Sequence, residues 1–309
     1  MCRKGELRLD GARVAPSARV EEGQDVRIPP LPEADRPAPP PDRPGRDDAA
    51  MIQAAVIWKD EHIIALNKPA GLPSQGGSGQ GGRHVDGLAP ALMFGYKDPP
   101  KLVHRLDKDT SGVLLLARTD RVARSLSEAL RHRAVRKIYW AAVAGVPSPR
   151  AGTIRYGLVK MPGGPRGEEK MRCVHPAQIE ATPGAKRAVT DYVTLEKAGG
   201  RLAWVALRPV TGRTHQLRAH LAELGHPILG DGKYGGHAQD NPGDGWGAGT
   251  GGALSRKLHL HARTLVFEHP VTKAMLTLTA PLPPHMAQSW AFLGWDEREA
   301  PADPFEDRG

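Results

Sequence analysis

Residues 101–118 read KLVHRLDKDTSGVLLLAR, and this stretch decides how the rest of the chain is interpreted. Charged and hydroxyl side chains from His104 to Ser111 directly precede an apolar run with the length of a buried strand. Burying a carboxylate there costs several kcal/mol in order of magnitude unless cations or hydrogen-bond donors hold it, and Arg105 and Lys108 are placed to do so. The stretch predicts either a chemically active loop before a buried strand or a solvated connection with local ion pairs.

Apolar runs bounded by turn residues recur on both sides of this stretch and predict further strands. With the run already quoted, they are residues 55–58, 62–67, 111–118, 137–145, 202–209, 265–270 and 275–281. A helix is predicted over 119–133, where apolar residues follow helical spacing and arginines occupy the other faces. A second helix is predicted to begin at a Thr214 cap and to end at Gly225.

The first 50 residues differ from the remainder. Residues 28–48 contain eight prolines among charged residues and predict an extended linker. The residues before them predict small β-hairpins, but about 27 residues cannot bury a stable core alone. We therefore expect a small module at 1–30, a linker at 31–50, a main domain at 51–296 and a polar tail at 297–309.

Composition bounds the class of protein. With 39% hydrophobic and 25% charged residues in 309, the chain is neither fibrous nor wholly disordered. Its 43 basic and 34 acidic residues give a net charge of +9, which indicates either a polyanionic partner or simply a basic surface. No apolar run approaches the roughly 18 residues of a membrane span, and the start lacks the apolar stretch of a signal peptide. We expect a cytoplasmic protein with no membrane contact.

Residues 207–231, LRPVTGRTHQLRAHLAELGHPILGD, form a second cluster of polar side chains. Arg213 lies in a turn before a predicted helix, where it is either an anion-binding residue or a plain surface arginine. The spacing of His215, His220 and His226 puts no two imidazoles on one helical face, which argues against a zinc site. The glycine-rich residues 76–82 lack the Lys and Ser/Thr of a P-loop, so a nucleotide site is not predicted.

Four ordered blocks resemble the RluA-type pseudouridine synthases. HRLDKDTSGVLLLAR (104–118) resembles the signature that carries the family's catalytic aspartate. The others are NKPAGLPSQGG (67–77), KIYWAAVAG (137–145), and TGRTHQLRAHL (211–221) with GHPILGDGKYG (225–235). The opening residues resemble the second half of an alpha-L RNA-binding module. The resemblance implies an α/β (α+β) fold with a largely antiparallel mixed sheet and flanking helices, preceded by a partial alpha-L module.

The family's reaction breaks the N1–C1′ bond of uridine, turns the uracil within the site, and joins C5 to C1′. It involves no redox change, so the resemblance implies no cofactor and no metal. Asp107 is implied as nucleophile or base, and attack at C1′, attack on the ring and proton abstraction all stay open. Arg218 is implied as the active-site basic residue, and we expect its guanidinium to pair with Asp107 across the pocket.

The remaining site residues follow from the same resemblance. Tyr139 either stacks on the uracil or fills the core as an ordinary strand aromatic. Arg105 either occupies the stack vacated by an extruded base or pairs with a phosphate, and Leu217 forms an apolar wall. The other residues expected to bind substrate or RNA are Arg213, His104 and Lys68.

We expect the protein to isomerise specific uridines in 23S-type large-subunit ribosomal RNA, acting as a monomer. One alternative is a transfer-RNA uridine isomerase with identical chemistry. Another is a non-catalytic RNA-binding protein of ribosome assembly. The set of Asp107, Tyr139 and Arg218 argues against the second alternative, because binding alone needs no aspartate facing a polyanion.

Overall fold

The computed structural model describes residues 7–15, 18–28, 44–76, 82–132, 134–161, 169–235 and 252–306. The chain divides into two compact units, Met1–Asp42 and Arg43–Gly309. Most of the predicted proline-rich linker lies outside the described residues. None of the helices in the described ranges combines the length and apolar content needed to cross a membrane.

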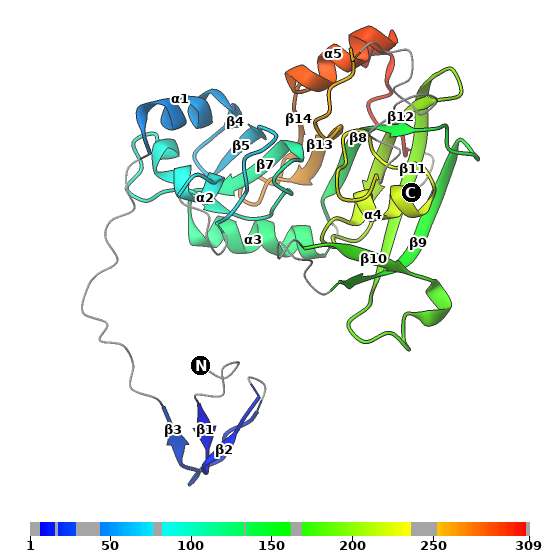
Figure 1. Ribbon diagram of the computed structural model, residues 1–309. Helices are drawn as coiled ribbons and strands as arrows, with labels where there is room; N and C mark the ends of the chain where they lie inside the picture. The colour runs from blue at the N-terminus through cyan, green and yellow to red at the C-terminus, as the bar shows by residue number, and fades with distance from the viewer. Residues whose placement is uncertain are drawn as a thin grey trace. The chain divides into compact units, whose positions relative to one another are not determined.

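The first unit is a small three-stranded antiparallel sheet (Figure 1). Its strands are β1 (Arg8–Leu9), β2 (Ala12–Arg13) and β3 (Val26–Arg27), in the order β2-β1-β3. Asp10 and Gly11 both have positive φ, as a tight two-residue hairpin turn requires. The Asp10 carboxylate also accepts the N–H of Asp25 at 2.9 Å, which ties the hairpin to β3. The predicted hairpin is therefore present.

The second unit contains an 11-stranded sheet and its covering helices. The strands are β4 (Val56–Lys59), β5 (Ile63–Lys68), β6 (Lys101–Leu102), β7 (Ser111–Ala117), β8 (Arg136–Ala144), β9 (Ala151–Lys160), β10 (Met171–Val174), β11 (Lys186–Ala198), β12 (Leu202–Pro209), β13 (Leu260–Glu268) and β14 (Met275–Thr279). The helices are α1 (Arg46–Ala54), α2 (Val85–Leu88), α3 (Asp120–Arg131), α4 (Gln216–Glu223) and α5 (Pro284–Leu293), with short 3-10 helices at Ala89–Leu92, Pro176–Gln178 and Glu297–Glu299.

The main path of the sheet runs β10-β9-β11-β12-β8-β13-β7-β5-β4, with β14 paired to β13 and β6 to β7. Among the described strands, β13 and β7 run parallel, and the other pairs are antiparallel. The mixed, largely antiparallel sheet expected from the sequence is therefore confirmed.

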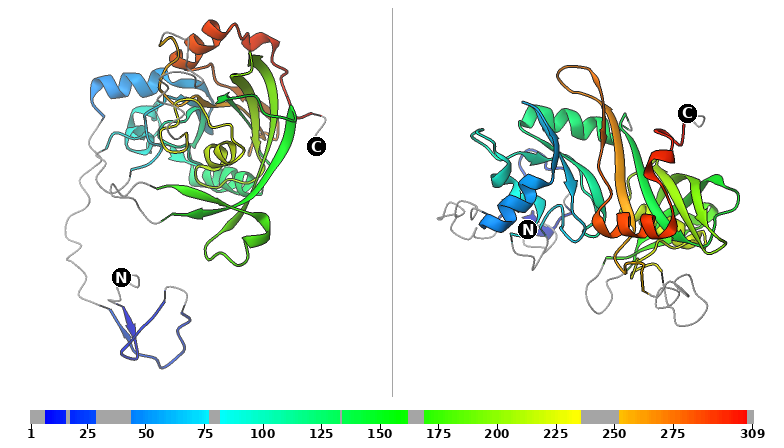
Figure 2. Two further views of the ribbon diagram at one scale, coloured as in Figure 1. Left: turned by 45° about the vertical axis from the view of Figure 1, so that its right-hand side comes forward. Right: turned by 90° about the horizontal axis from the view of Figure 1, so that it is seen from above.

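Both faces of the β8–β12 half of the sheet are covered, because successive side chains of a strand point to opposite faces. Trp140 and Trp204 lie on one face, where they pack with Trp290 of α5. Val143 and Val205 lie on the other face, in the cluster that includes Leu217 and Leu221 of α4. Helices α4 and α5 thus sit on opposite sides of the same strands (Figure 2).

The β5–β7 half is covered in the same way. Leu115 packs on the face that carries Leu126 of α3, and Leu114 packs on the face that carries Ile52 of α1. Every residue of β7 is buried, which explains why its sequence is a continuous apolar run rather than an alternating one. Figure 1 shows α1 and α3 on the two sides of these strands.

The two halves of the sheet meet at a seam where β7 pairs with β13. Ser111 and Gly112, from the 101–118 stretch, are the β7 residues that form this pairing. A Cβ on Gly112, whose φ is +112°, would lie 2.2 Å from the carbonyl oxygen of Ala262. The hydroxyl of Ser111 lies 2.9 Å from Nδ1 of His261 on β13. This seam therefore brings the polar loop just before β7 opposite the beginning of α4.

Three of the predicted segments differ from the structure. Helix α1 begins at Arg46, inside the range predicted as linker, because Ile52 is buried against β5 and β7. Phe305, in the predicted polar tail, is fully buried in the tryptophan cluster. Thr214 does not cap α4: the cap position is His215, with left-handed backbone angles, so the helix begins one residue later than a Thr214 cap implies.

Candidate active site

A cleft of about 990 Å³ lies between the loop before β7 and the beginning of α4. Of the eight residues predicted to act in the site, all except Lys68 line this cleft: His104, Arg105, Asp107, Tyr139, Arg213, Leu217 and Arg218. They come from the loop before β7, from β8 and from the start of α4. In the described ranges, no cluster of His, Cys, Asp and Glu has a composition suited to a metal ion.

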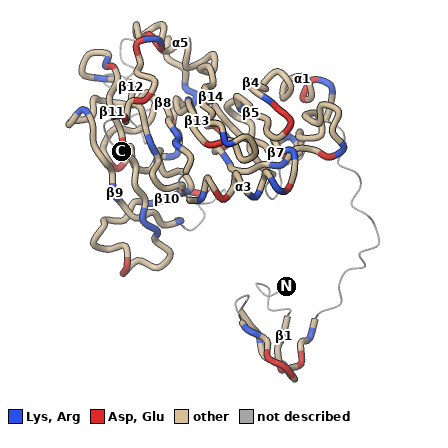
Figure 3. The backbone as a smooth tube through the Cα atoms, turned by 180° about the vertical axis from the view of Figure 1, so that it is seen from behind, with Lys and Arg blue, Asp and Glu red and all other residues tan. Residues whose placement is uncertain are grey.

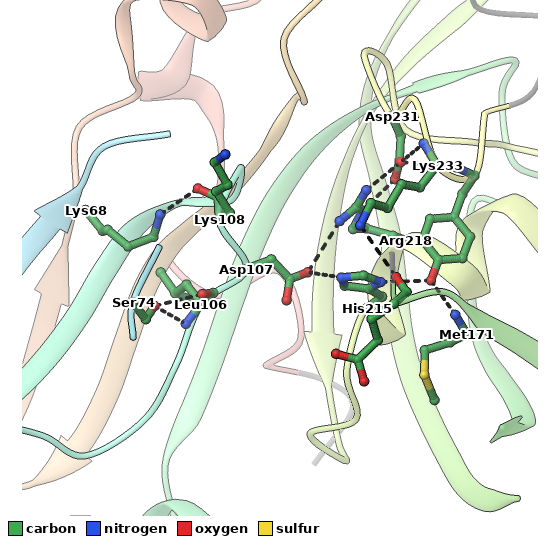
Figure 4. A network of polar contacts seen from close by, with 12 residues as sticks. Lys68, Ser74, Leu106, Asp107, Lys108, Met171, His215, Arg218, Asp231 and Lys233 are labelled. Carbon is green, nitrogen blue, oxygen red and sulfur yellow. Dashed lines mark hydrogen bonds and ion pairs between the residues drawn. The ribbon is translucent and has the colours of Figure 1, made fainter. Parts of the chain in front are cut away.

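The backbone on both sides of Asp107 is held by the segment that follows β5. The Ser74 hydroxyl donates to the carbonyl of Leu106 at 2.7 Å and accepts its N–H at 3.0 Å. On the other side, the carbonyl of Lys108 accepts from the Lys68 ammonium at 3.0 Å and from the N–H of Gly71 at 2.9 Å. The Ser74–Leu106 and Lys68–Lys108 contacts are drawn in Figure 4. Together with the Gly71 contact, they fix the direction in which Asp107 leaves the backbone.

The prediction that Lys68 binds RNA is wrong. Its side chain is fully buried, and its ammonium donates to the carbonyls of Pro69, Leu72 and Lys108. Burial lowers the pKa of Lys68 to about 7, opposed by the negative charges of Asp109 and Asp107. Lys68 therefore supports the loop that carries Asp107 and does not face the cleft.

Asp107 and Arg218 face each other in the cleft, as expected. The Nη1 of Arg218 lies 3.7 Å from Oδ2 of Asp107, and the two side chains are 5% and 29% exposed, respectively. The closer partner of Arg218 is Asp231, whose two carboxylate oxygens accept from Nε and Nη2 at 2.7 Å each. Burial alone lowers the pKa of Arg218, but the hydrogen bonds and charge of Asp231, with the charge of Asp107, raise it overall.

Asp231 is a fixed carboxylate in the loop after α4. Its side chain has no exposed surface, and its Oδ1 also accepts the N–H groups of Lys233 at 3.0 Å and Tyr234 at 3.2 Å. The preceding Gly230 has a φ of +73°, and a Cβ there would lie 2.0 Å from the carbonyl oxygen of Lys257. The loop is thus built to hold one carboxylate against the guanidinium of Arg218.

His215, labelled in Figure 4, and Tyr234 complete the cluster. The Nε2 of His215 lies 3.9 Å from Oδ2 of Asp107, and its Nδ1 lies 3.0 Å from the Tyr234 hydroxyl. The sequence prediction assigned no role to His215, Asp231 or Tyr234. A signal was present, since all three lie in the blocks 211–221 and 225–235 that resemble the family.

Tyr139 lies at the boundary between the cleft and the apolar core. Its ring lines the cleft and also packs, partly buried, against two of the apolar clusters. Burial, together with the negative charge of Asp107, raises the pKa of Tyr139, so its hydroxyl keeps its proton at neutral pH.

The remaining cleft residues differ in what they offer a substrate. Arg105 is exposed and, within the described residues, has no hydrogen-bond or ion-pair partner. Arg213 is also exposed and donates from Nε to the carbonyl of Arg187 at 3.2 Å, whereas Leu217 is buried and forms an apolar wall. His104 accepts the N–H of Leu115 at 3.0 Å, and burial, with the charge of Lys137, lowers its pKa to about 3, so it supplies no positive charge.

Comparisons with known proteins agree with this geometry. The family described as RNA pseudouridylate synthase matches residues 62–223. The chain is 36% identical over 285 residues to ribosomal large subunit pseudouridine synthase C of Salmonella typhi, covering 91% of this chain and 82% of the relative. It is 41% identical over 234 residues to an uncharacterised RNA pseudouridine synthase of Zymomonas mobilis, covering 75% and 95%.

A solved structure gives the same result. Human RNA pseudouridylate synthase domain containing 4 superposes with a TM-score of 0.63 at 33% identity, covering 80% of this chain and 95% of that one. The cleft, the sheet that forms it and the sequence relatives all indicate an enzyme that converts uridine to pseudouridine in RNA. The chain belongs to the RNA pseudouridylate synthase family.

Proposed function

We propose that this protein isomerises specific uridines of large-subunit ribosomal RNA and that Asp107 is the reacting carboxylate. The observation that carries the proposal is the position of Asp107: it opens into the cleft, is 29% exposed, and has Arg218 within 3.7 Å on one side. A carboxylate that faces a polyanion is unfavourable for binding alone, but a bond-forming step requires one. The named relatives that modify the large ribosomal subunit support the choice of RNA.

In this proposal a uridine leaves its stack and enters the cleft, at a cost of a few kcal/mol in order of magnitude. Arg105 and Arg213 lie exposed at the cleft and would meet the vacated stack or the flanking phosphates. The Tyr139 ring would lie along the uracil, with Leu217 as the apolar wall. The N1–C1′ bond breaks, the C5–C1′ bond forms, C5 gives up its proton to solvent, and N1 takes up a proton in its place.

The arginines along α3 support an RNA partner. Arg124 and Arg131 line a groove of about 690 Å³ that continues from the cleft, although Asp120 and Glu128 also lie in it. Figure 3 shows basic and acidic residues together along this helix. A ribosomal RNA substrate supports a cytoplasmic location.

Release of tritium from RNA that carries 5-tritiated uridine tests the chemistry. Asp107→Asn should abolish release while it leaves RNA affinity within about tenfold of the wild type. Appreciable release by this variant would remove Asp107 from the mechanism. Mapping pseudouridines in ribosomal and transfer RNA from a strain that lacks the protein tests the choice of substrate. If pseudouridines are missing from transfer RNA alone, the substrate is transfer RNA and not ribosomal RNA.

A further inference from the structure

The backbone of His215 has a conformation that is unfavourable for a residue with a side chain. It has φ +50° and ψ +23°, in the left-handed region that residues with a Cβ rarely adopt. Its side chain makes no capping hydrogen bond to α4, so helix capping does not explain the conformation. Such conformations persist where the surroundings fix them, and they cluster at active sites. The left-handed turn aims the imidazole at Asp107, and the ring is only 9% exposed.

Tyr234 determines which nitrogen of His215 carries the proton. The Tyr234 hydroxyl accepts the N–H of Met171 at 2.9 Å and lies 3.0 Å from Nδ1 of His215. Burial raises the pKa of Tyr234 to about 12, so the hydroxyl keeps its own proton. Among the described residues, Nδ1 is the acceptor within reach of that proton. The imidazole of His215 therefore accepts at Nδ1, and its proton lies on Nε2.

The ring plane is fixed as well as the tautomer. His215 and Tyr234 pack edge to face, with centroids 5.7 Å apart and planes at 85°. Burial lowers the pKa of His215, against the charge of Asp107, so the ring is neutral near pH 7. The other charged groups that act on this ring are Arg218, Lys233 and Glu169. A neutral imidazole in this position offers one N–H, directed toward Asp107.

Both donors converge on the same oxygen of Asp107. Nε2 of His215 is 3.9 Å from Oδ2, and Nη1 of Arg218 is 3.7 Å from Oδ2. Separations of this length close by a small side-chain rotation or through one water, as catalytic contacts do when substrate binds.

We propose that His215 is a positioning residue for Asp107. Its Nε2–H, oriented by Tyr234, acts with Arg218 to hold Oδ2, and this leaves Oδ1 as the oxygen that reacts with the uridine. The inference rests on the proposed function, in which Asp107 is the reacting carboxylate. It adds a second donor and an orienting hydroxyl that the sequence did not assign, and it assigns different roles to the two oxygens of one carboxylate.

Three variants of the full-length protein test it in single-turnover tritium release at saturating enzyme. His215→Phe keeps a ring of similar size but removes the donor, and should slow release about 100-fold, the effect of losing one preorganised donor, with RNA affinity within about threefold. His215→Gln restores an N–H close to the Nε2 position and should recover at least about tenfold of that loss. Tyr234→Phe removes only the orienting hydroxyl and should slow release about tenfold.

A matched control separates positioning from stability. His226 is a partly buried histidine whose Nδ1 contacts the carbonyl of Ala144 at 2.9 Å, and it does not line the cleft. His226→Phe should lower the melting temperature without a comparable loss of single-turnover rate. If His215→Phe does not fold, the comparison of Tyr234→Phe with the wild type provides the same test of orientation.

The outcomes are distinct. Release by His215→Phe at more than a third of the wild-type rate, or a Gln variant as slow as the Phe variant, would overturn the positioning role. For Tyr234→Phe, a wild-type rate would overturn the orienting role. Absence of release by the wild type, or release by Asp107→Asn, would instead reject the proposed function. Loss in His215→Phe with recovery in His215→Gln supports the inference.

Discussion

Asp231→Asn should remove the negative charge that holds the Arg218 guanidinium, while the side chain at position 231 keeps nearly the same shape. The wild-type carboxylate accepts two hydrogen bonds of 2.7 Å from Arg218, and the two side chains are 0% and 5% exposed. Removing one partner of a buried ion pair costs about 3–5 kcal/mol. The amide retains one acceptor oxygen, so we expect the lower end, about 3 kcal/mol.

This loss has a thermal and a catalytic consequence. In a domain of this size each kcal/mol lowers the melting temperature by about 2–4 °C, so Asp231→Asn should melt about 6–12 °C below the wild type. Without its support, the Nη1 of Arg218 is no longer held 3.7 Å from Asp107. The single-turnover rate of tritium release should therefore fall by about 100-fold at a temperature where the variant is folded.

Asp191→Asn is the matched control. Asp191 accepts from Nε of Arg208 at 3.0 Å, forms an ion pair with its Nη2 at 3.0 Å, is largely buried, and does not line the cleft. It should lower the melting temperature but leave the rate of release near that of the wild type. The reasoning is refuted if Asp231→Asn retains the wild-type rate, or if both variants lose activity in proportion to their loss of stability.

Three further predictions concern RNA binding, acid stability and packing. If Arg124 and Arg131 contact phosphates, replacing each with Gln should reduce the slope of log affinity against log salt concentration by about 0.7–0.9. Filter binding between about 50 and 300 mM salt measures this slope. His104 and His261 are held neutral because burial lowers the pKa of each from 6.5 to about 3. Since the unfolded chain takes up these protons first, stability should be full above about pH 6.5 and should fall by up to about 1.4 kcal/mol per pH unit for each histidine toward pH 3, measured by urea unfolding. Gly112→Ala should lower stability by several kcal/mol in order of magnitude, measured by thermal unfolding, because its Cβ would lie 2.2 Å from the carbonyl oxygen of Ala262.

Each of these has a control elsewhere in the second unit. Lys273→Gln removes a charge at an exposed turn and should leave the RNA affinity and its salt slope unchanged. His132→Gln removes an exposed histidine and should leave the acid slope unchanged. Gly200→Ala meets no atom within 4 Å and should be tolerated. Equal effects in a test variant and its control would contradict the corresponding prediction.

Local sequence was enough to find the strands that lie at the centre of the sheet. Residues 111–118 and 202–209 were predicted as strands, and β7 and β12 occupy these ranges almost to the residue. Both are covered on two faces, so their sequences are long apolar runs that need no knowledge of their neighbours. Strands β9 and β11 were not predicted, because exposed and charged side chains interrupt their apolar residues.

For the site, the sequence pointed to the polar loop before β7, and its resemblance to the family named Asp107, Tyr139 and Arg218, because these residues lie in short contiguous blocks that match family motifs. Only the tertiary structure decided that Asp231 is the close partner of Arg218 and that Lys68 faces inward. Those facts depend on how the loop after α4 folds back over the helix and on how the segment after β5 closes under the loop before β7. Such contacts join residues whose local sequences carry no signal of each other, since burial and the direction of a side chain are set by the packing of distant segments.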